Sequence, residues 1–193
     1  MEITNKNPKI IMLAGKARAG KDTTASFIKE YGEKNNLKVI NLQFSFYIKY
    51  YAKLISSWDG SEETKPRTLL QQLGTDIIRD KIDNYYFIKR IVDDIKVLSY
   101  FADIITISDA RLPEELDTIN NTYPNVIKIN IVRPEFDNSL NQTESVHRTE
   151  TALDNYDKYN YEIINDGTLE ELKINVFNLL DHDYGKKEWK IFM

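Results

Sequence analysis

A glycine-bracketed loop near the N-terminus has the residue types and spacing that most clearly indicate chemistry. Residues 15–23 read Gly-Lys-Ala-Arg-Ala-Gly-Lys-Asp-Thr and fit the pattern G-x-x-x-x-G-K. In such a loop the backbone N–H groups surround a phosphate, and the lysine, here Lys21, reaches the β- and γ-phosphates. The following helix presents its N-terminus to the same anion. The pattern predicts a site for a triphosphate, formed by Gly15, Lys16, Ala17, Arg18, Ala19, Gly20, Lys21, Asp22, Thr23 and Thr24.

One position of this loop departs from the usual pattern. The residue after the lysine is normally Ser or Thr, whose hydroxyl contacts Mg²⁺. Here it is Asp22, followed by Thr23. Asp22 is then either a favourable acidic residue in the first helical turn or a ligand on the metal side of the site. The Thr23 hydroxyl is an alternative for that second role.

Five short apolar segments predict strands, and segments with helical patterns lie between them. The predicted strands are residues 9–14, 38–42, 103–108, 125–132 and 161–164. The predicted helices are residues 22–30, 45–57, 66–73, 84–98, 113–118 and 168–180. Strands that alternate with helices are typical of a parallel sheet covered on both faces. We therefore expect an α/β fold in which the phosphate loop joins the first strand to the first helix.

Two segments interrupt the alternation. Residues 45–100 are mostly helical and contain no predicted strand, so we expect a helical insertion between the second and third strands. Residues 138–158 are polar and lack a clear pattern, and we interpret them as part of a second insertion.

Composition narrows the classes of function. The chain has 193 residues with 26 Lys plus Arg and 30 Asp plus Glu, which fits one domain with a formal charge of −4. This balance disfavours nucleic acid as a partner, since such binding depends on phosphate neutralisation. The absence of cysteine excludes disulfides, thiol catalysis and zinc–cysteine sites. No apolar run approaches a membrane span and no signal-peptide core is evident, so we expect a cytoplasmic protein without a membrane partner.

Several motifs resemble, in the same order, those of phage-type deoxynucleoside monophosphate kinases. The sequence Gly-Lys-Asp-Thr at residues 20–23 looks like the loop of that family. Residues 67–76, Arg-Thr-Leu-Leu-Gln-Gln-Leu-Gly-Thr-Asp, are similar to its Arg…Leu-Gln-x-Leu-Gly-Thr segment. Asp-Ala-Arg at residues 109–111 is similar to its Asp-x-Arg. Further similar segments are residues 44–49, 132–134, 147–150 and 165–172.

The resemblance implies a three-layer P-loop kinase fold with a five-stranded parallel sheet. It implies one domain of residues 1–193, with a monophosphate-binding insertion at residues 45–100 and a small lid at residues 134–158. The implied reaction transfers phosphate from ATP, with Mg²⁺, to a (deoxy)nucleoside monophosphate. Because that acceptor is already ionised, the reaction needs no strong general base. Catalysis then consists of positioning two anions and neutralising their charge.

The resemblance also implies roles for individual residues. The implied catalytic residues are Lys21, Asp109, Arg111 and Arg133. The implied acceptor-binding residues are Lys49, Arg67, Gln71 and Arg79. Arg148 of the lid is expected to bind ATP together with the loop residues, and the candidate metal ligands are Asp22, Thr23 and Asp109. For Asp109 a cap on the following helix is the alternative role, since carboxylates accept hydrogen bonds from helix N-termini.

Two other functions stay open from the sequence. One is a P-loop kinase of another small phosphate ester, such as phosphomevalonate, and the other is a module that binds nucleotides without turnover. The preferred base and the oligomeric state, with a homodimer among the options, are also left open.

Overall fold

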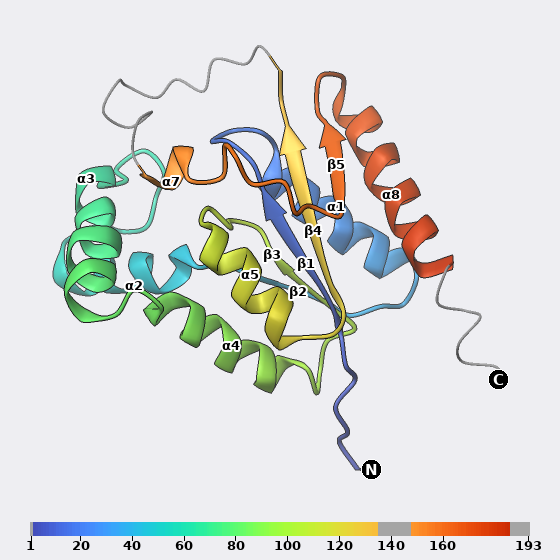
Figure 1. The fold of residues 1–193 in the computed structure, drawn as a ribbon, viewed down its shortest axis with the longest axis horizontal. Helices are drawn as coiled ribbons and strands as arrows, with labels where there is room; N and C mark the ends of the chain where they lie inside the picture. Colours follow the sequence, from blue (N-terminus) through green and yellow to red (C-terminus); the bar gives the residue numbers. More distant parts are fainter. Residues whose placement is uncertain (1, 135–147, 186–193) are drawn as a thin grey trace.

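The computed structural model describes residues 2–134 and 148–185. Within these residues five strands form one sheet in the order β2-β3-β1-β4-β5 (Figure 1). Every neighbouring pair of strands is parallel, so all carboxyl ends lie at one edge of the sheet. The five predicted strands are confirmed as β1 (Lys9–Ala14), β2 (Val39–Leu42), β3 (Ile104–Ile107), β4 (Val126–Val132) and β5 (Tyr161–Ile164).

Helices occupy most of the chain between the strands. The described helices are α1 (Lys21–Lys34), α2 (Ser45–Ile55), α3 (Arg67–Gln71), η1 (Gln72–Ile82), α4 (Tyr86–Leu98), α5 (Pro113–Thr122), α7 (Arg148–Thr151) and α8 (Leu169–Gly185). Of these, η1 is a π-helix that continues α3. The helix predicted for residues 66–73 is therefore longer than expected and changes its hydrogen-bonding pattern. In the described residues no helix is long and apolar enough to cross a bilayer.

The sheet lies between two layers of helices, and the alternation of side chains along β1 shows why. Ile10 and Met12 pack on one face with a cluster that includes residues of α4 and α5. Ile11 and Leu13 pack on the other face with residues of α1 and α8. Since both faces of the central strand are apolar, neither can be left open to water. The predicted three-layer α/β architecture is confirmed (Figure 1).

Residues 45–98 contain helices and connecting segments but no strand. The helices α2, α3 and η1 stand beside the sheet, at the left in Figure 1. Ala52, Trp58 and Leu73 form a small buried cluster among them. These three helices thus have a small cluster of their own, while Ile78 of η1 and Ile48 of α2 also pack against the main core on the sheet.

Candidate functional site

The loop between β1 and α1 has a backbone that only glycine supports at two positions. Gly15 has φ +136°, and a Cβ there would collide with the carbonyl oxygen of Ile131. Gly20 has φ +108°, and a Cβ there would lie 2.6 Å from Asn165 Nδ2. Both positions thus combine a left-handed backbone with a close neighbour. Two of the seven glycines of the chain therefore lie where the loop packs closely against β4 and against the turn between β5 and α8.

Asn165 supports the loop from the turn after β5. Its Nδ2 donates a hydrogen bond of 2.8 Å to the carbonyl oxygen of Ala19. Its backbone N–H donates to the carbonyl oxygen of Val132 at 2.7 Å. Asn165 therefore joins the loop to the ends of β4 and β5. Asn165 belongs to residues 165–172, one of the similar segments described above, but no sequence pattern indicated its contact with the loop.

Lys21 is folded back onto the loop. Its Nζ donates hydrogen bonds of 2.8 Å to the carbonyl oxygens of Gly15 and Lys16. The residue is only 8% exposed. Burial, and then the nearby Arg111, lower the pKa of Lys21 to about 8, while Asp22 and Asp109 oppose that shift. A phosphate in the loop would add negative charge beside this ammonium and favour its protonated form.

Asp22 faces the carboxyl ends of β2 and β3. Its Oδ1 accepts hydrogen bonds from Gln43 Nε2 at 3.2 Å and from Ser108 Oγ at 3.1 Å. Gln43 also lies 3.4 Å, Oε1 to Nζ, from Lys49 of α2. Gln43 and Ser108 were not predicted as site residues. Their only sequence signal was a position at the end of a predicted strand, with Ser108 the last residue of residues 103–108 and Gln43 directly after residues 38–42.

The donor set around Asp22 fits Mg²⁺ with few protein ligands. The Asp22 carboxylate and the Ser108 hydroxyl are oxygen donors, and Mg²⁺ usually combines one or two carboxylates with waters and substrate phosphates. Among the described residues there is no group of three or more His, Cys, Asp or Glu side chains that could enclose a metal ion. Thr23 and Thr24 line neither of the two cavities described below.

Asp109 holds the N-terminus of α2. Its two carboxylate oxygens accept hydrogen bonds from the backbone N–H groups of Phe44, at 2.8 Å, and Ser45, at 2.9 Å. The helix that it caps belongs to residues 45–100 and is not α5, which follows it in sequence. Asp109 also lines the larger cavity, so it connects the end of β3 with the insertion.

A cavity of about 640 Å³ extends from the loop to the insertion. The loop side contributes Lys21 and Asp22. The structure brings all four predicted acceptor-binding residues, and Asp109 and Arg111, into the lining of the same cavity. From the described part of the chain seven Lys and Arg side chains line it, against four Asp and Glu. These cations are Arg18, Lys21, Lys49, Lys65, Arg67, Arg79 and Arg111.

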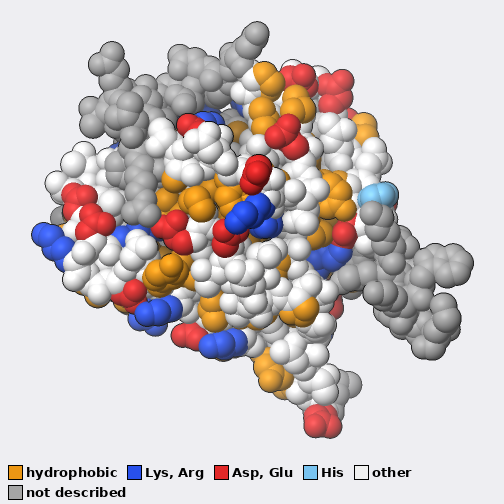
Figure 2. All heavy atoms as spheres, in the orientation of Figure 1, with side chains coloured by type: hydrophobic (Ala, Val, Ile, Leu, Met, Phe, Trp, Pro, Cys, Tyr) orange, Lys and Arg blue, Asp and Glu red, His pale blue; other side chains and the backbone are white. Residues whose placement is uncertain are grey.

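This concentration of cations contrasts with the rest of the molecule. The whole chain has a formal charge of −4. On the face shown in Figure 2, Lys and Arg side chains are interspersed with Asp and Glu and do not form a patch. A cavity lined mainly by cations attracts small anions.

Every carboxylate that lines the larger cavity in the described residues already accepts hydrogen bonds. Asp22 and Asp109 have the partners given above. Glu62 accepts two hydrogen bonds from Lys65 Nζ, at 2.8 and 3.0 Å, and this contact lowers the pKa of Glu62. Glu115 is fully buried and pairs with Arg79 at 2.9 Å. In this structure all four carboxylates are thus held by protein donors.

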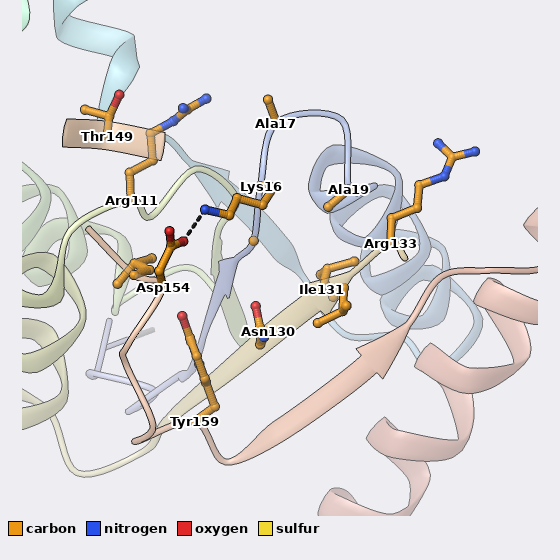
Figure 3. Close-up of a pocket in the computed structure, with 13 residues that line it drawn as sticks. Lys16, Ala17, Ala19, Arg111, Asn130, Ile131, Arg133, Thr149, Asp154 and Tyr159 are labelled. Carbon is orange, nitrogen blue, oxygen red and sulfur yellow. Dashed lines mark hydrogen bonds and ion pairs between the residues drawn. The ribbon is translucent and has the colours of Figure 1, made fainter. Parts of the chain in front are cut away.

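A smaller cavity of about 300 Å³ lies on the other side of the loop (Figure 3). Lys16 forms an ion pair with Asp154 there, and Arg111 lines this cavity as well as the larger one. Arg133 is exposed and lies on the opposite side of the loop from Arg111 (Figure 3). Arg148 lies in α7 with only its backbone described, and His147 lies outside the described residues.

Comparisons with known proteins agree with this geometry. A family model described as "Deoxynucleotide monophosphate kinase" matches residues 47–176. A protein of Acanthamoeba polyphaga mimivirus named "Putative deoxynucleotide monophosphate kinase" is 26% identical over 199 residues, which covers 90% of this chain and 96% of that protein.

Solved structures share the fold at low sequence identity. The APS kinase of Mycobacterium tuberculosis, in complex with AMPPNP and APS, matches with a TM-score of 0.54 and 13% identity over 90% of this chain and 98% of the other. Thymidylate kinase from Ehrlichia chaffeensis matches with a TM-score of 0.51 and 13% identity, over 90% and 98% of the two chains. These similarities show that the architecture is the α/β P-loop kinase fold.

Proposed function

Because the chain belongs to the deoxynucleotide monophosphate kinase family, we propose that it transfers the γ-phosphoryl group of ATP to a deoxynucleoside monophosphate. The products are ADP and the deoxynucleoside diphosphate. The family supports kinase chemistry on a nucleotide. The choice of ATP as donor and of a deoxyribose acceptor is the proposal, as is the assignment of residues to each substrate.

One observation carries the proposal: a single cavity joins the phosphate loop to a wall of cations from the insertion. Two phosphate groups that repel each other must approach for transfer to occur. Lysine and arginine side chains on both sides of the cavity neutralise that repulsion and hold the two groups in line. Arg111 lines both cavities, so it is suited to bridge the donor and acceptor phosphates.

A phosphate acceptor requires less of this site than an alcohol acceptor does. An alcohol must lose its proton as it attacks, and this step calls for a base within hydrogen-bond reach. A phosphate monoester has a second pKa of about 6 and needs no such help at pH 7. A phosphate acceptor therefore requires cations and no base from the larger cavity, and seven Lys and Arg side chains of the described residues line it.

The proposed roles follow the two sides of the cavity. Lys21 and the loop N–H groups hold the ATP phosphates, and Arg133 and Arg148 belong to the donor side. Lys49, Arg67 and Gln71 hold the acceptor nucleotide. Asp22 and Ser108 would hold Mg²⁺, with Thr23 and Asp109 as further candidates. When bound, Mg²⁺ neutralises charge on the donor phosphates.

A panel of acceptors with ATP tests the proposal. We expect ADP formation with at least one deoxynucleoside monophosphate, at a higher kcat/KM than with its ribonucleotide. Turnover only with a non-nucleotide ester such as phosphomevalonate would replace the proposal by a kinase for that ester. Nucleotide binding without ADP formation from any acceptor would favour a sensing module.

A further inference from the structure

Arg79 lines the larger cavity, yet its side chain is directed into the protein. The side chain is only 8% exposed. Its Nη2 donates to Glu115 Oε1 at 2.9 Å, and its Nη1 donates to the carbonyl oxygen of Gly74 at 3.1 Å. The guanidinium also lies over the ring of Phe87, 4.8 Å from the ring centroid. Both terminal nitrogens are therefore bonded within the protein.

Glu115 continues this connection toward Arg111. Its Oε2 accepts hydrogen bonds from the backbone N–H groups of Arg111, at 2.8 Å, and Leu112, at 3.1 Å. The Glu115 side chain is 2% exposed. One buried ion pair thus links the π-helix η1 to the backbone of the arginine that lines both cavities. Arg79 and Glu115 lie 36 residues apart in sequence.

At the other end of the ion pair, Arg79 contacts the part of η1 that lines the larger cavity. The carbonyl oxygen of Gly74 belongs to η1, five residues before Arg79, and both Gly74 and Thr75 line the larger cavity. A Cβ at Gly74 would lie 2.9 Å from Ile48 Cδ1 of α2, so η1 and α2 are packed closely at this point. The Arg79 side chain therefore bonds to the stretch of η1 that packs against α2 and lines the larger cavity.

We propose that Arg79 is a positioning residue: through its buried ion pair with Glu115 it fixes the backbone of Arg111 relative to η1, and it is not a ligand of the acceptor phosphate. The proposal rests on the proposed function in so far as Arg111 bridges the transferring group. A direct ligand role would require the acceptor dianion to compete with Glu115 for Arg79. The displaced Glu115 carboxylate would then be buried without a counter-charge and would face that dianion.

Steady-state kinetics of single and double variants test the positioning role. In Arg79→Met and in Glu115→Gln we expect kcat to fall about tenfold or more, because small displacements of a catalytic group are costly. The acceptor KM should change less than about threefold. The double variant should be no slower than the slower single variant, and Arg79→Lys should recover part of kcat by keeping a cation beside Glu115. A matched control is Arg90→Met, which removes an exposed arginine of α4 that stacks on Tyr47 and Tyr86 outside the cavity.

Amide hydrogen exchange gives a second readout that does not depend on turnover. The Arg111 and Leu112 amides should exchange at least about tenfold faster in Arg79→Met, with the β1 amides unchanged. If Arg79→Met unfolds and all amides accelerate, Arg79→Lys is measured in its place and should show the same local effect to a smaller degree. If wild-type protein phosphorylates no monophosphate, the proposed function fails, and the exchange result still decides the positioning link. Unchanged exchange at Arg111 and Leu112, or a large rise of acceptor KM at constant kcat in Arg79→Met alone, would overturn the inference.

Discussion

The two walls of the larger cavity are built in different ways. The loop wall follows a fully buried central strand, and its shape is fixed by backbone conformation at Gly15 and Gly20 and by the contact with Asn165. The insertion wall consists of α2, α3 and η1 around a small core of its own. Ile78 of η1 and Ile48 of α2 pack against the main core on the sheet. Polar contacts also join the insertion to the sheet side, from Asp109 to the N-terminus of α2 and from Glu115 to Arg79.

We expect the loop wall to recognise the phosphates that every nucleotide donor carries. We expect the insertion wall to recognise the features in which one acceptor differs from another. Backbone N–H groups and one ammonium recognise phosphates without regard to the base attached to them. Side chains on helices recognise a particular acceptor, and they can be exchanged without rebuilding the sheet. We expect changes on the loop wall to abolish transfer for every acceptor. Changes on the insertion wall should alter which acceptor is used and how well.

The largest expected effect comes from Lys21→Ala on the loop wall. Removing the ammonium should lower kcat by about 10²–10³-fold for every acceptor, in line with the loss of one charge-stabilising group. Circular dichroism should show an unchanged fold. Lys29→Ala, an exposed lysine of the same helix, is the matched control and should keep full activity. Near-normal turnover by Lys21→Ala would mean that the donor phosphates lie elsewhere.

Gly15→Ala tests whether backbone conformation fixes the loop wall. The left-handed φ of Gly15 and the collision with Ile131 should cost roughly 1–3 kcal/mol of stability. For a chain of this size such a loss corresponds to a decrease in Tm of about 3–10 °C. Gly167→Ala is the comparison, because the φ of Gly167 is not left-handed and a Cβ there meets the exposed Glu171 side chain and no backbone. Its smaller cost is a shift of Glu171, which accepts hydrogen bonds from Thr168. Equal Tm values for the two variants would argue against a strained loop.

Sequence patterns anticipate the loop wall better than the insertion wall. The apolar segment at residues 9–14, two glycines and Lys21 are neighbours in sequence, so the pattern contains the local geometry. The π-helix was not predicted, because a helical pattern of apolar residues does not distinguish bonding to the fourth from bonding to the fifth residue. The link from Glu115 to Arg79 was also missed, because it forms only when α5 and η1 pack together.

The same reasoning applies to individual polar residues. Asp22 was singled out by its place in the motif, whereas its partners Gln43 and Ser108 come from the ends of two other strands. The topology of the sheet brings those strand ends together, and no short pattern in the sequence encodes that neighbourhood. The alternative considered for Asp109 was a cap on the following helix. The structure instead shows it capping α2, a helix that precedes it by more than 50 residues.

Arg67→Ala should have an intermediate effect, confined to the insertion wall. Loss of one charge-assisted contact to the acceptor corresponds to about 1.5–3 kcal/mol, or roughly 10–100-fold in the acceptor kcat/KM. The KM for ATP should stay within about twofold of wild type. Lys96→Ala, an exposed lysine of α4 paired with Asp93, should change neither constant. An effect of Arg67→Ala on the ATP KM alone would assign Arg67 to the loop wall. The two walls would then no longer differ in which substrate they bind.

The smallest expected effect is a pH dependence specific to the loop wall. Because the pKa of Lys21 is lowered to about 8 in the free protein, its ammonium loses its proton as the pH rises through that value. The kcat/KM for ATP should fall about fourfold between pH 7.0 and 8.5, following the protonated fraction. The acceptor phosphate is already a dianion across that range. In Lys21→Arg the guanidinium keeps its proton, so the ratio of its kcat/KM at the two pH values should lie near one even if its absolute activity is lower. Parallel pH profiles for wild type and Lys21→Arg would place the titrating group outside the loop.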